Sequence, residues 1–278
     1  ILMIFNLKNI INGKKKFIAI DVGCRGGDLP KINGHLDEVQ VYGFDPDEKE
    51  CERLNEHYKG HSIFFVPQAL GDKVEEKLIY ITREPACSSF YKPIKHFYKL
   101  YPGMMVTEEI DQTSISVTTL DQWCLENNIN KIDYLKIDTQ GYELNVLKGS
   151  VSSLKNIRFL DIEVEFNQMY ENQPIFSEVD LFLRNHGFEL WKFNNIVHYG
   201  INNEADKEIS ILSIHYDEHR NEINSRGGQI FWADAKYIKK EIIHCHTGDL
   251  TTHQRNRDIR MAEILKLDDI ADRLKKNS

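Results

Sequence analysis

Short apolar runs alternate along much of this chain with segments in which apolar residues recur at helical spacing. The clearest run is Phe17–Val22 (FIAIDV), which is apolar except for Asp21 and leads directly into a glycine-rich turn. Strands that are buried on both faces have this continuous apolar character, whereas strands with one face in water alternate. The pattern therefore predicts an α/β fold with a doubly wound, mostly parallel sheet and helices on both faces.

Six further runs predict the remaining strands of a seven-stranded sheet: Val41–Phe44, Ile63–Val66, Tyr134–Ile137, Phe159–Phe166, 188–193 and 229–234. Helices are expected after Pro46, over Leu120–Asn127 with Thr119 as N-cap, over Gly141–Leu147, from Phe176, and once around Ile259–Leu274. Between them we expect a hairpin over Leu70–Thr82, a long loop or lid over 84–113 and an acceptor-side insertion over 194–228. These elements indicate one domain over 1–245, followed by a helical extension over 246–278.

Composition narrows the class of protein. The 278 residues carry a formal net charge of −8, which disfavours a nucleic-acid partner, and 10% are aromatic, which favours a folded core. No apolar run approaches the roughly 18 residues of a membrane span, and the opening Ile1–Ile11 lacks the long apolar region of a signal peptide. The five scattered cysteines form no CxxC pair, as is typical of a reducing compartment. We expect a cytoplasmic enzyme with a small-molecule or glycan substrate, and the sequence is compatible with a homo-oligomer.

The glycine-rich turn DVGCRGG follows the first predicted strand. Glycines there permit close backbone approach to a ligand, and free amides at a helix N-terminus attract an anionic group. About twenty residues later, Asp45 follows the second strand, where a carboxylate can accept hydrogen bonds from ribose hydroxyls. Arg25 stands where a dinucleotide fingerprint needs glycine, so the pattern predicts a nucleoside site of another kind.

Carboxylates also follow two later strands. Asp138 comes directly after Tyr134–Ile137, and Asp161, Glu163 and Glu165 alternate with apolar residues, which places them on one face of the fifth strand. Buried carboxylates need a partner or a function. They are therefore predicted to act as a base for a weakly nucleophilic hydroxyl, to bind Mg²⁺, or to pair with a lysine or arginine.

Six ordered segments together resemble the FkbM-type class I methyltransferases: DVGCRGG, YGFDPD, VPQALGD, VTTLDQWCLENN, YLKIDTQGYELNVLKG and LDIEVEF. The resemblance runs from about residue 17 to 193. It implies a Rossmann-like class I methyltransferase sheet, S-adenosylmethionine (SAM) as methyl donor and a hydroxyl acceptor, frequently on a sugar. Two positions depart from the family pattern: Cys24-Arg25 replaces small or asparagine residues, and Gln140 stands where glutamate is common.

Carried over by position, the resemblance places the methionine end of SAM at the glycine turn, the ribose at Asp45 and the adenine near Gln68. The expected cofactor-binding residues are Asp21, Gly23, Cys24, Arg25, Gly26, Asp45, Pro46, Gln68, Ala69, Leu70, Ser89 and Asp138. The expected catalytic residues are Asp138, Glu165 and Glu163. The same three acids are the expected ligands of Mg²⁺, if the enzyme uses it.

The leading hypothesis is a SAM-dependent O-methyltransferase for a hydroxyl of a nucleotide-activated or surface-polysaccharide sugar. One alternative is methylation of another small hydroxyl acceptor, such as a polyketide or a lipid-linked molecule. The other is a non-catalytic SAM-binding module of a polysaccharide-synthesis protein. The carboxylates at the strand ends favour an enzyme, because a binding module has no need of desolvated acids.

Overall fold

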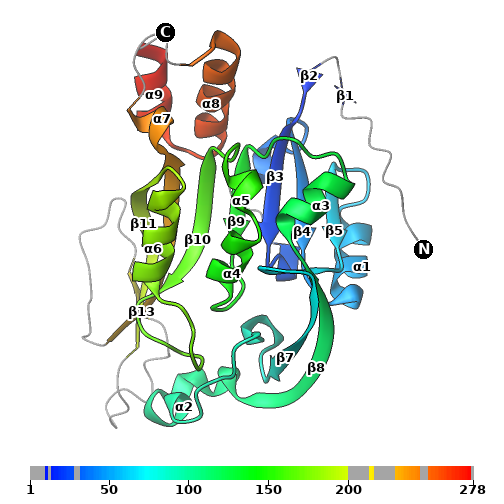
Figure 1. The fold of residues 1–278 in the computed structure, drawn as a ribbon, viewed down its shortest axis with the longest axis vertical. Helices are drawn as coiled ribbons and strands as arrows, with labels where there is room; N and C mark the ends of the chain where they lie inside the picture. Colours follow the sequence, from blue (N-terminus) through cyan, green and yellow to red (C-terminus); the bar gives the residue numbers. More distant parts are fainter. Residues whose placement is uncertain are drawn as a thin grey trace.

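The computed structural model describes residues 10–11, 14–27, 32–199, 213–215, 229–244 and 250–276. Within them the central sheet has eight strands in the order β5, β4, β3, β9, β10, β13, β11, β12 (Figure 1). The five strands from β5 to β10 are parallel, β13 runs antiparallel to β10 and β11, and β12 runs antiparallel to β11. The bounds are β3 (Phe17–Val22), β4 (Val39–Phe44), β5 (Ile63–Val66), β9 (Tyr134–Ile137), β10 (Phe159–Glu165), β11 (Phe188–Tyr199), β12 (Ser213–His215) and β13 (Gln229–Lys239). The predicted doubly wound, mostly parallel sheet is confirmed.

Alternate residues of the central strand β3 enter two separate cores. Ile18 and Ile20 pack on the face covered by α3 (Leu120–Glu126), α4 (Glu143–Lys148), α5 (Val151–Leu154) and α6 (Phe176–Asn185) (Figure 1). Phe17 and Ala19 pack on the face covered by α1 (Glu48–His57), whose Cys51 and Leu54 are buried there. Because successive side chains of a strand point to opposite faces, a strand that is buried on both faces needs an uninterrupted apolar run.

Two helix starts follow the capping rules. The Thr119 hydroxyl accepts a hydrogen bond from the Gln122 amide, which confirms this residue as the N-cap of α3. The Asp47 carboxylate accepts from the Lys49 and Glu50 amides and begins α1 at the end of β4. Both helices are therefore fixed directly next to strand ends.

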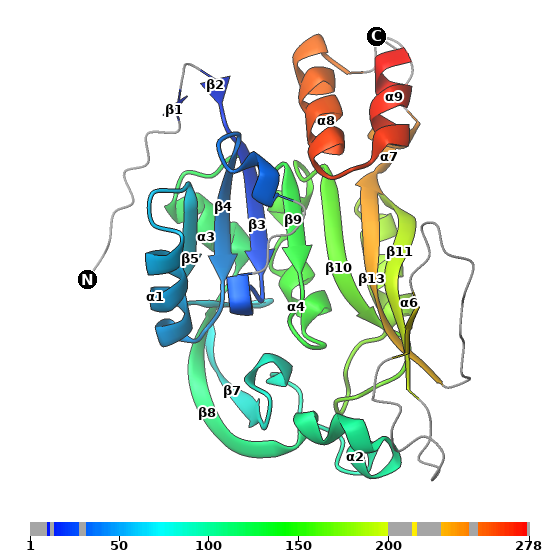
Figure 2. The same ribbon diagram turned by 180° about the vertical axis from the view of Figure 1, so that it is seen from behind.

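The C-terminal segment is not one helix. The single helix expected around Ile259–Leu274 is replaced by α8 (Thr252–Ile264) and α9 (Asp268–Lys276), and the short α7 (Lys240–Ile243) precedes this segment. Lys266 adopts a left-handed φ of 56° between α8 and α9, and this turn lets both helices bury apolar residues against the same core. Asp258 on α8 pairs with the buried Arg158 at 2.6 Å. Figure 2 shows this helical pair at the opposite end of the sheet from β7 and β8.

The predicted hairpin over Leu70–Thr82 is wrong. Instead, β7 (Glu75–Thr82) pairs with β8 (Glu109–Thr118), and β8 also pairs with β6 (Ala69–Leu70). Most of β8 is polar and exposed, so hydrophobic periodicity could not reveal it. The intervening chain, expected as a loop or lid, contains α2 (Phe97–Leu100) and the short turns η3 (Pro85–Cys87), η4 (Pro102–Thr107). The small sheet of β6, β7 and β8 lies below the carboxyl ends of the central strands (Figure 1).

The remaining described elements are β1 (Ile10–Ile11), β2 (Lys14–Lys15) and the turns η1 (Arg25–Gly27), η2 (Asn33–His35). The insertion expected over 194–228 lies mostly outside the described residues, apart from the end of β11 and β12. None of the described helices is both long and apolar enough to cross a bilayer.

Candidate active site

A pocket of about 490 Å³ lies at the carboxyl ends of β3, β4 and β9. Gly23, Asp45 and Asp138 each come directly after one of these strands and line it. Apolar side chains from the small sheet form another wall, and Ile79 and Ile81 of β7 belong to it. Strand order reverses beside β3, and open α/β sheets hold ligands at such a switch point. The pocket also falls in the size range of small-molecule sites.

Most of the expected cofactor residues line this one pocket: Gly23, Arg25, Asp45, Pro46, Gln68, Ala69, Leu70, Ser89 and Asp138. Asp21, Cys24 and Gly26 do not. Asp21 is buried and pairs with Lys136 Nζ at 3.3 Å, and Cys24 packs into the core beneath the turn. These two side chains support the turn from below rather than facing the pocket.

The glycine turn differs from the expected anion cradle. Gly23 has φ +82°, and a Cβ there would lie 1.7 Å from the Asp138 carbonyl oxygen, so glycine permits close approach of two strand ends. The amides of Gly23 and Cys24 donate to the Phe44 carbonyl, and that of Gly26 donates to Glu50. Gly27 also donates within the turn. These four amides are therefore used inside the protein, and η1 is a single turn rather than the start of a described helix.

Asp45 is fixed at the carboxyl end of β4 by a hydrogen bond from a neighbouring backbone amide. Its side chain is 8% exposed, Oδ1 accepts from the Asp47 amide at 2.8 Å, and Arg25 Nη1 lies 4.0 Å from the same oxygen. Burial raises the pKa of Asp45, while the Asp47 amide and the Arg25 guanidinium act in the opposite direction. Arg25 also forms an ion pair with Asp47 at 3.1 Å. It is the one basic residue among those that line the pocket, and it lies beside Asp45.

Asp138 is the acid that reaches the pocket from β9. Its side chain is 33% exposed, and Lys136 Nζ lies 3.5 Å from Oδ2. Oδ1 accepts a hydrogen bond from Gln140 Nε2 at 3.1 Å. Burial acts to lower the pKa of Lys136, but the carboxylates of Asp21 and Asp138 outweigh it and raise that pKa. Lys136 therefore remains a cation and lies beside the Asp138 carboxyl group.

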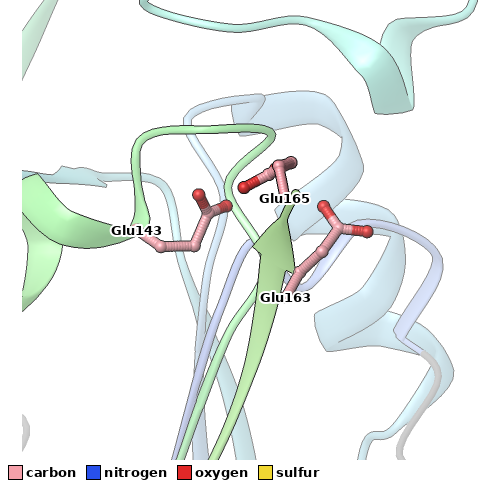
Figure 3. Close-up of side chains that lie close together, drawn as sticks. All are labelled: Glu143, Glu163 and Glu165. Atoms are coloured by element: carbon pink, nitrogen blue, oxygen red, sulfur yellow. The ribbon is translucent and has the colours of Figure 1, made fainter. Parts of the chain in front are cut away.

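Behind Asp138, three glutamates point toward one another (Figure 3). Oxygens of Glu143, Glu163 and Glu165 lie within 4.8 Å of one another, and the three residues are at most 8% exposed. Glu143 Oε1 accepts from the amides of Thr139 and Gly141. Burial raises the pKa of Glu143 to about 7 and raises those of Glu163 and Glu165 well above their usual range. Neutral, protonated carboxyl groups are thus favoured in this cluster.

The cluster does not fit a magnesium site. Its carboxylates are suitable ligands, but the set that lies together contains Glu143 in place of the expected Asp138. None of its members lines the pocket. Mg²⁺ usually keeps several water ligands, and side chains as buried as these leave no room for them. No catalytic step is therefore derived through a metal ion.

The acids on β10 have three different surroundings. Asp161 forms an ion pair with Lys236 and accepts from the Tyr134 hydroxyl at 3.0 Å, as expected for a structural pair. Glu163 accepts from Gln140 at 3.1 Å, and Glu165 Oε1 is buried with no hydrogen-bond partner among the described residues. Neither glutamate lines the pocket, so a direct role in catalysis stays a prediction for both.

Sequence reasoning missed several pocket residues. Thr139 and Gln140 follow Asp138 in the quoted YLKIDTQG segment, and their position at a strand end was a usable signal. The apolar wall had no such signal, because the long connection over 83–108 separates β7 from β8, and Thr113 and Ile115 belong to the polar strand β8. Glu143 was missed as a member of the acid cluster because it begins a helix rather than following a strand.

Comparison with known proteins decides the family. The family model described as Methyltransferase FkbM domain matches residues 30–190, more than half of the chain. The chain belongs to this family. The 2-O-methyltransferase NoeI of Sinorhizobium fredii (strain NBRC 101917 / NGR234) is 25% identical to this FkbM chain over 182 residues, which cover 59% of this chain and 70% of NoeI.

Two solved structures are distant likenesses of this FkbM chain. Magnesium protoporphyrin IX methyltransferase (ChlM) from Synechocystis PCC 6803, with bound SAM, is 12% identical with a TM-score of 0.38, covering 81% of this chain and 70% of that one. Precorrin-6y C5,15-methyltransferase from Geobacter metallireducens GS-15 is 8% identical with a TM-score of 0.39, covering 81% and 80%. Likenesses at this level say nothing about the substrate of this chain.

Proposed function

We propose that this chain is a cytoplasmic SAM-dependent O-methyltransferase that methylates a hydroxyl of a nucleotide-activated or surface-polysaccharide sugar. The observation that carries the proposal is the presence of Asp45 and Asp138 in one pocket of an FkbM-family chain. The 2-O-methyltransferase relative supports transfer to oxygen. The family resemblance supports a sugar as the molecule that bears this oxygen.

The pocket residues fit the parts of SAM. Asp45 presents a carboxylate for the ribose hydroxyls, and the walls offer apolar surface from Ile79, Ile81 and Phe90 beside Leu70 for the adenine. Because four amides of the glycine turn are already used, the Arg25 guanidinium is the group we assign to the methionine carboxylate. When bound, SAM supplies an electrophilic methyl group on a sulfonium.

Asp138 is the proposed base. A sugar hydroxyl is a weak nucleophile, so a positioned group must accept its proton as the oxygen attacks. Asp138 reaches the pocket from the strand next to the glycine turn, and the Lys136 ammonium group lies 3.5 Å from its Oδ2. Glu163 and Glu165 are buried behind Asp138, and we assign them a structural role in supporting it. The fold thus supplies orientation and proton removal.

Transfer of labelled methyl from SAM tests the proposal. The chain is incubated with radiolabelled SAM and separate panels of nucleotide sugars, oligosaccharides, lipid-linked acceptors and hydroxylated polyketides. We expect label on a sugar panel and a product whose NMR spectrum contains an O-methyl group. Label on a non-sugar panel alone would contradict the sugar assignment. SAM binding without transfer to any panel would favour a non-catalytic module.

A further inference from the structure

Gln140 is held in an unfavourable backbone conformation in the wall of the pocket. Its φ is +56°, in the left-handed region, and the next residue, Gly141, has φ +92°. A residue with a side chain is strained there by on the order of 1 kcal/mol or more, and such strain persists where surrounding contacts enforce it. Ser89 Oγ supplies one of these contacts by donating to the Gln140 carbonyl at 2.7 Å.

The strained turn places the Gln140 amide between two carboxylates. Nε2 donates to Asp138 Oδ1 and to Glu163 Oε2, both at 3.1 Å. Oε1 lies 3.4 Å from the Tyr170 hydroxyl, which orients the amide with its nitrogen toward the acids. An amide nitrogen carries two hydrogens, so it satisfies one oxygen of each carboxylate without adding charge. A carboxylate at this position would offer acceptors only.

We propose that Gln140 is a positioning residue that fixes Asp138 Oδ1 and separates Asp138 from the buried Glu163 by donating one hydrogen bond to each. The inference rests on the proposed function, in which Asp138 is the base. With Oδ1 bonded to Gln140 and the cation of Lys136 near Oδ2, the Asp138 side chain has a fixed orientation at the pocket. A base that is fixed in this way needs no reorientation when the acceptor arrives.

The charges around Asp138 make this role testable by titration. From its own strand the Lys136 ammonium group favours the ionised form of Asp138, and this cation is shared with Asp21 of β3. Acids from two other elements oppose it, and Cys87 of η3 also faces it. These acids are Glu163 and Glu165 of β10 and Glu143 of α4. Gln140→Glu would remove the hydrogen-bond donor to Asp138 and add a further acid beside it. Gln140→Ala would remove the hydrogen-bond donor alone.

The experiment follows the Asp138 carboxyl carbon by ¹³C NMR as a function of pH in the full chain, with the resonance assigned from the Asp138→Asn spectrum. We expect Gln140→Glu to move the titration midpoint upward by about one unit or more, and Gln140→Ala to move it less in the same direction. The acidic limb of the kcat profile should move with it. The control is Gln112→Glu, which makes the same charge change on the exposed part of β8.

The titration decides the inference. An unchanged midpoint in a folded Gln140→Glu protein would overturn it, and if that variant does not fold, an unchanged midpoint in Gln140→Ala would do the same. A moved midpoint in Gln140→Ala, which adds no charge, supports the positioning role, since loss of a purely structural contact would lower stability without selectively shifting Asp138. A midpoint that moves in Gln140→Glu but not in Gln140→Ala would reflect the added charge alone and would also overturn the inference. Absence of methyl transfer by the wild-type chain would contradict the proposed function, and the NMR result would still be read independently of it.

Discussion

Two groups of carboxylates lie at the carboxyl edge of the central sheet, and they differ in what balances their charge. Asp45 and Asp138 line the pocket, and each has a basic side chain within 4.0 Å, Arg25 and Lys136 respectively. Glu163 and Glu165 are buried, and the described residues give neither of them an ion pair with a lysine or arginine. Carboxyl groups along one edge of the sheet therefore fall into two kinds, those paired with a cation at the pocket and those buried without one.

The difference teaches how one sheet edge provides charged and neutral acids together. A nearby cation stabilises the ionised form, which suits binding of ribose hydroxyls and removal of a proton. Burial without a cation favours the protonated form, and burial is the largest cause of the raised pKa values of the three clustered glutamates. The acids that line the pocket beside a cation are thus the expected working groups, and the clustered glutamates are their support.

Replacing the pocket acid that we assign as the base should have the largest effect. Asp138→Asn keeps the shape of the side chain but removes the proton acceptor, so we expect kcat to fall by about two to four decades with SAM affinity nearly unchanged. Steady-state kinetics and SAM titration measure both. Glu52→Gln, an exposed change on α1, is the matched control. Near-normal turnover of Asp138→Asn would remove the distinction between working and supporting acids.

The strand-end acids could be predicted from sequence, whereas their surroundings could not. Asp45 and Asp138 follow apolar runs, and parallel strands bring such positions to one edge, so their shared pocket follows from local pattern. Lys136 lies inside a strand, and its pairing with Asp138 depends on side-chain directions that one sequence does not reveal. The apolar wall depends on β8, a polar strand held by pairing rather than by a hydrophobic face.

The buried acids should instead influence stability. Because the pKa of Glu143 rises from 4.5 to about 7 on folding, the folded state binds more protons than the unfolded state between these values. The free energy of unfolding should therefore fall as pH rises through this window, by roughly 3 kcal/mol from this group at 1.36 kcal/mol per unit. Urea unfolding at several pH values measures it. Glu143→Gln should show a flatter dependence than wild type, and equal slopes would count against a neutral acid at this site.

Chelation should have the smallest effect. None of the clustered glutamates lines the pocket, and their burial leaves Mg²⁺ no place for its waters, so methyl transfer should proceed equally with and without EDTA. The comparison uses protein dialysed against EDTA, with excess Mg²⁺ restored in a parallel sample. Activity that is lost in EDTA and recovered with Mg²⁺ would reassign the clustered acids from support to metal binding.

Calorimetric titration of SAM into wild type and Asp45→Ala tests the central claim most directly, because every role proposed above depends on SAM occupying this pocket. Hydrogen bonds to a charged group contribute about 1.5–3 kcal/mol, so loss of the Asp45 carboxylate should weaken SAM binding by roughly one to two decades. Glu52→Ala on α1 removes the same charge away from the pocket and should bind SAM like wild type. Unchanged SAM affinity in a folded Asp45→Ala protein would contradict the assignment of the pocket.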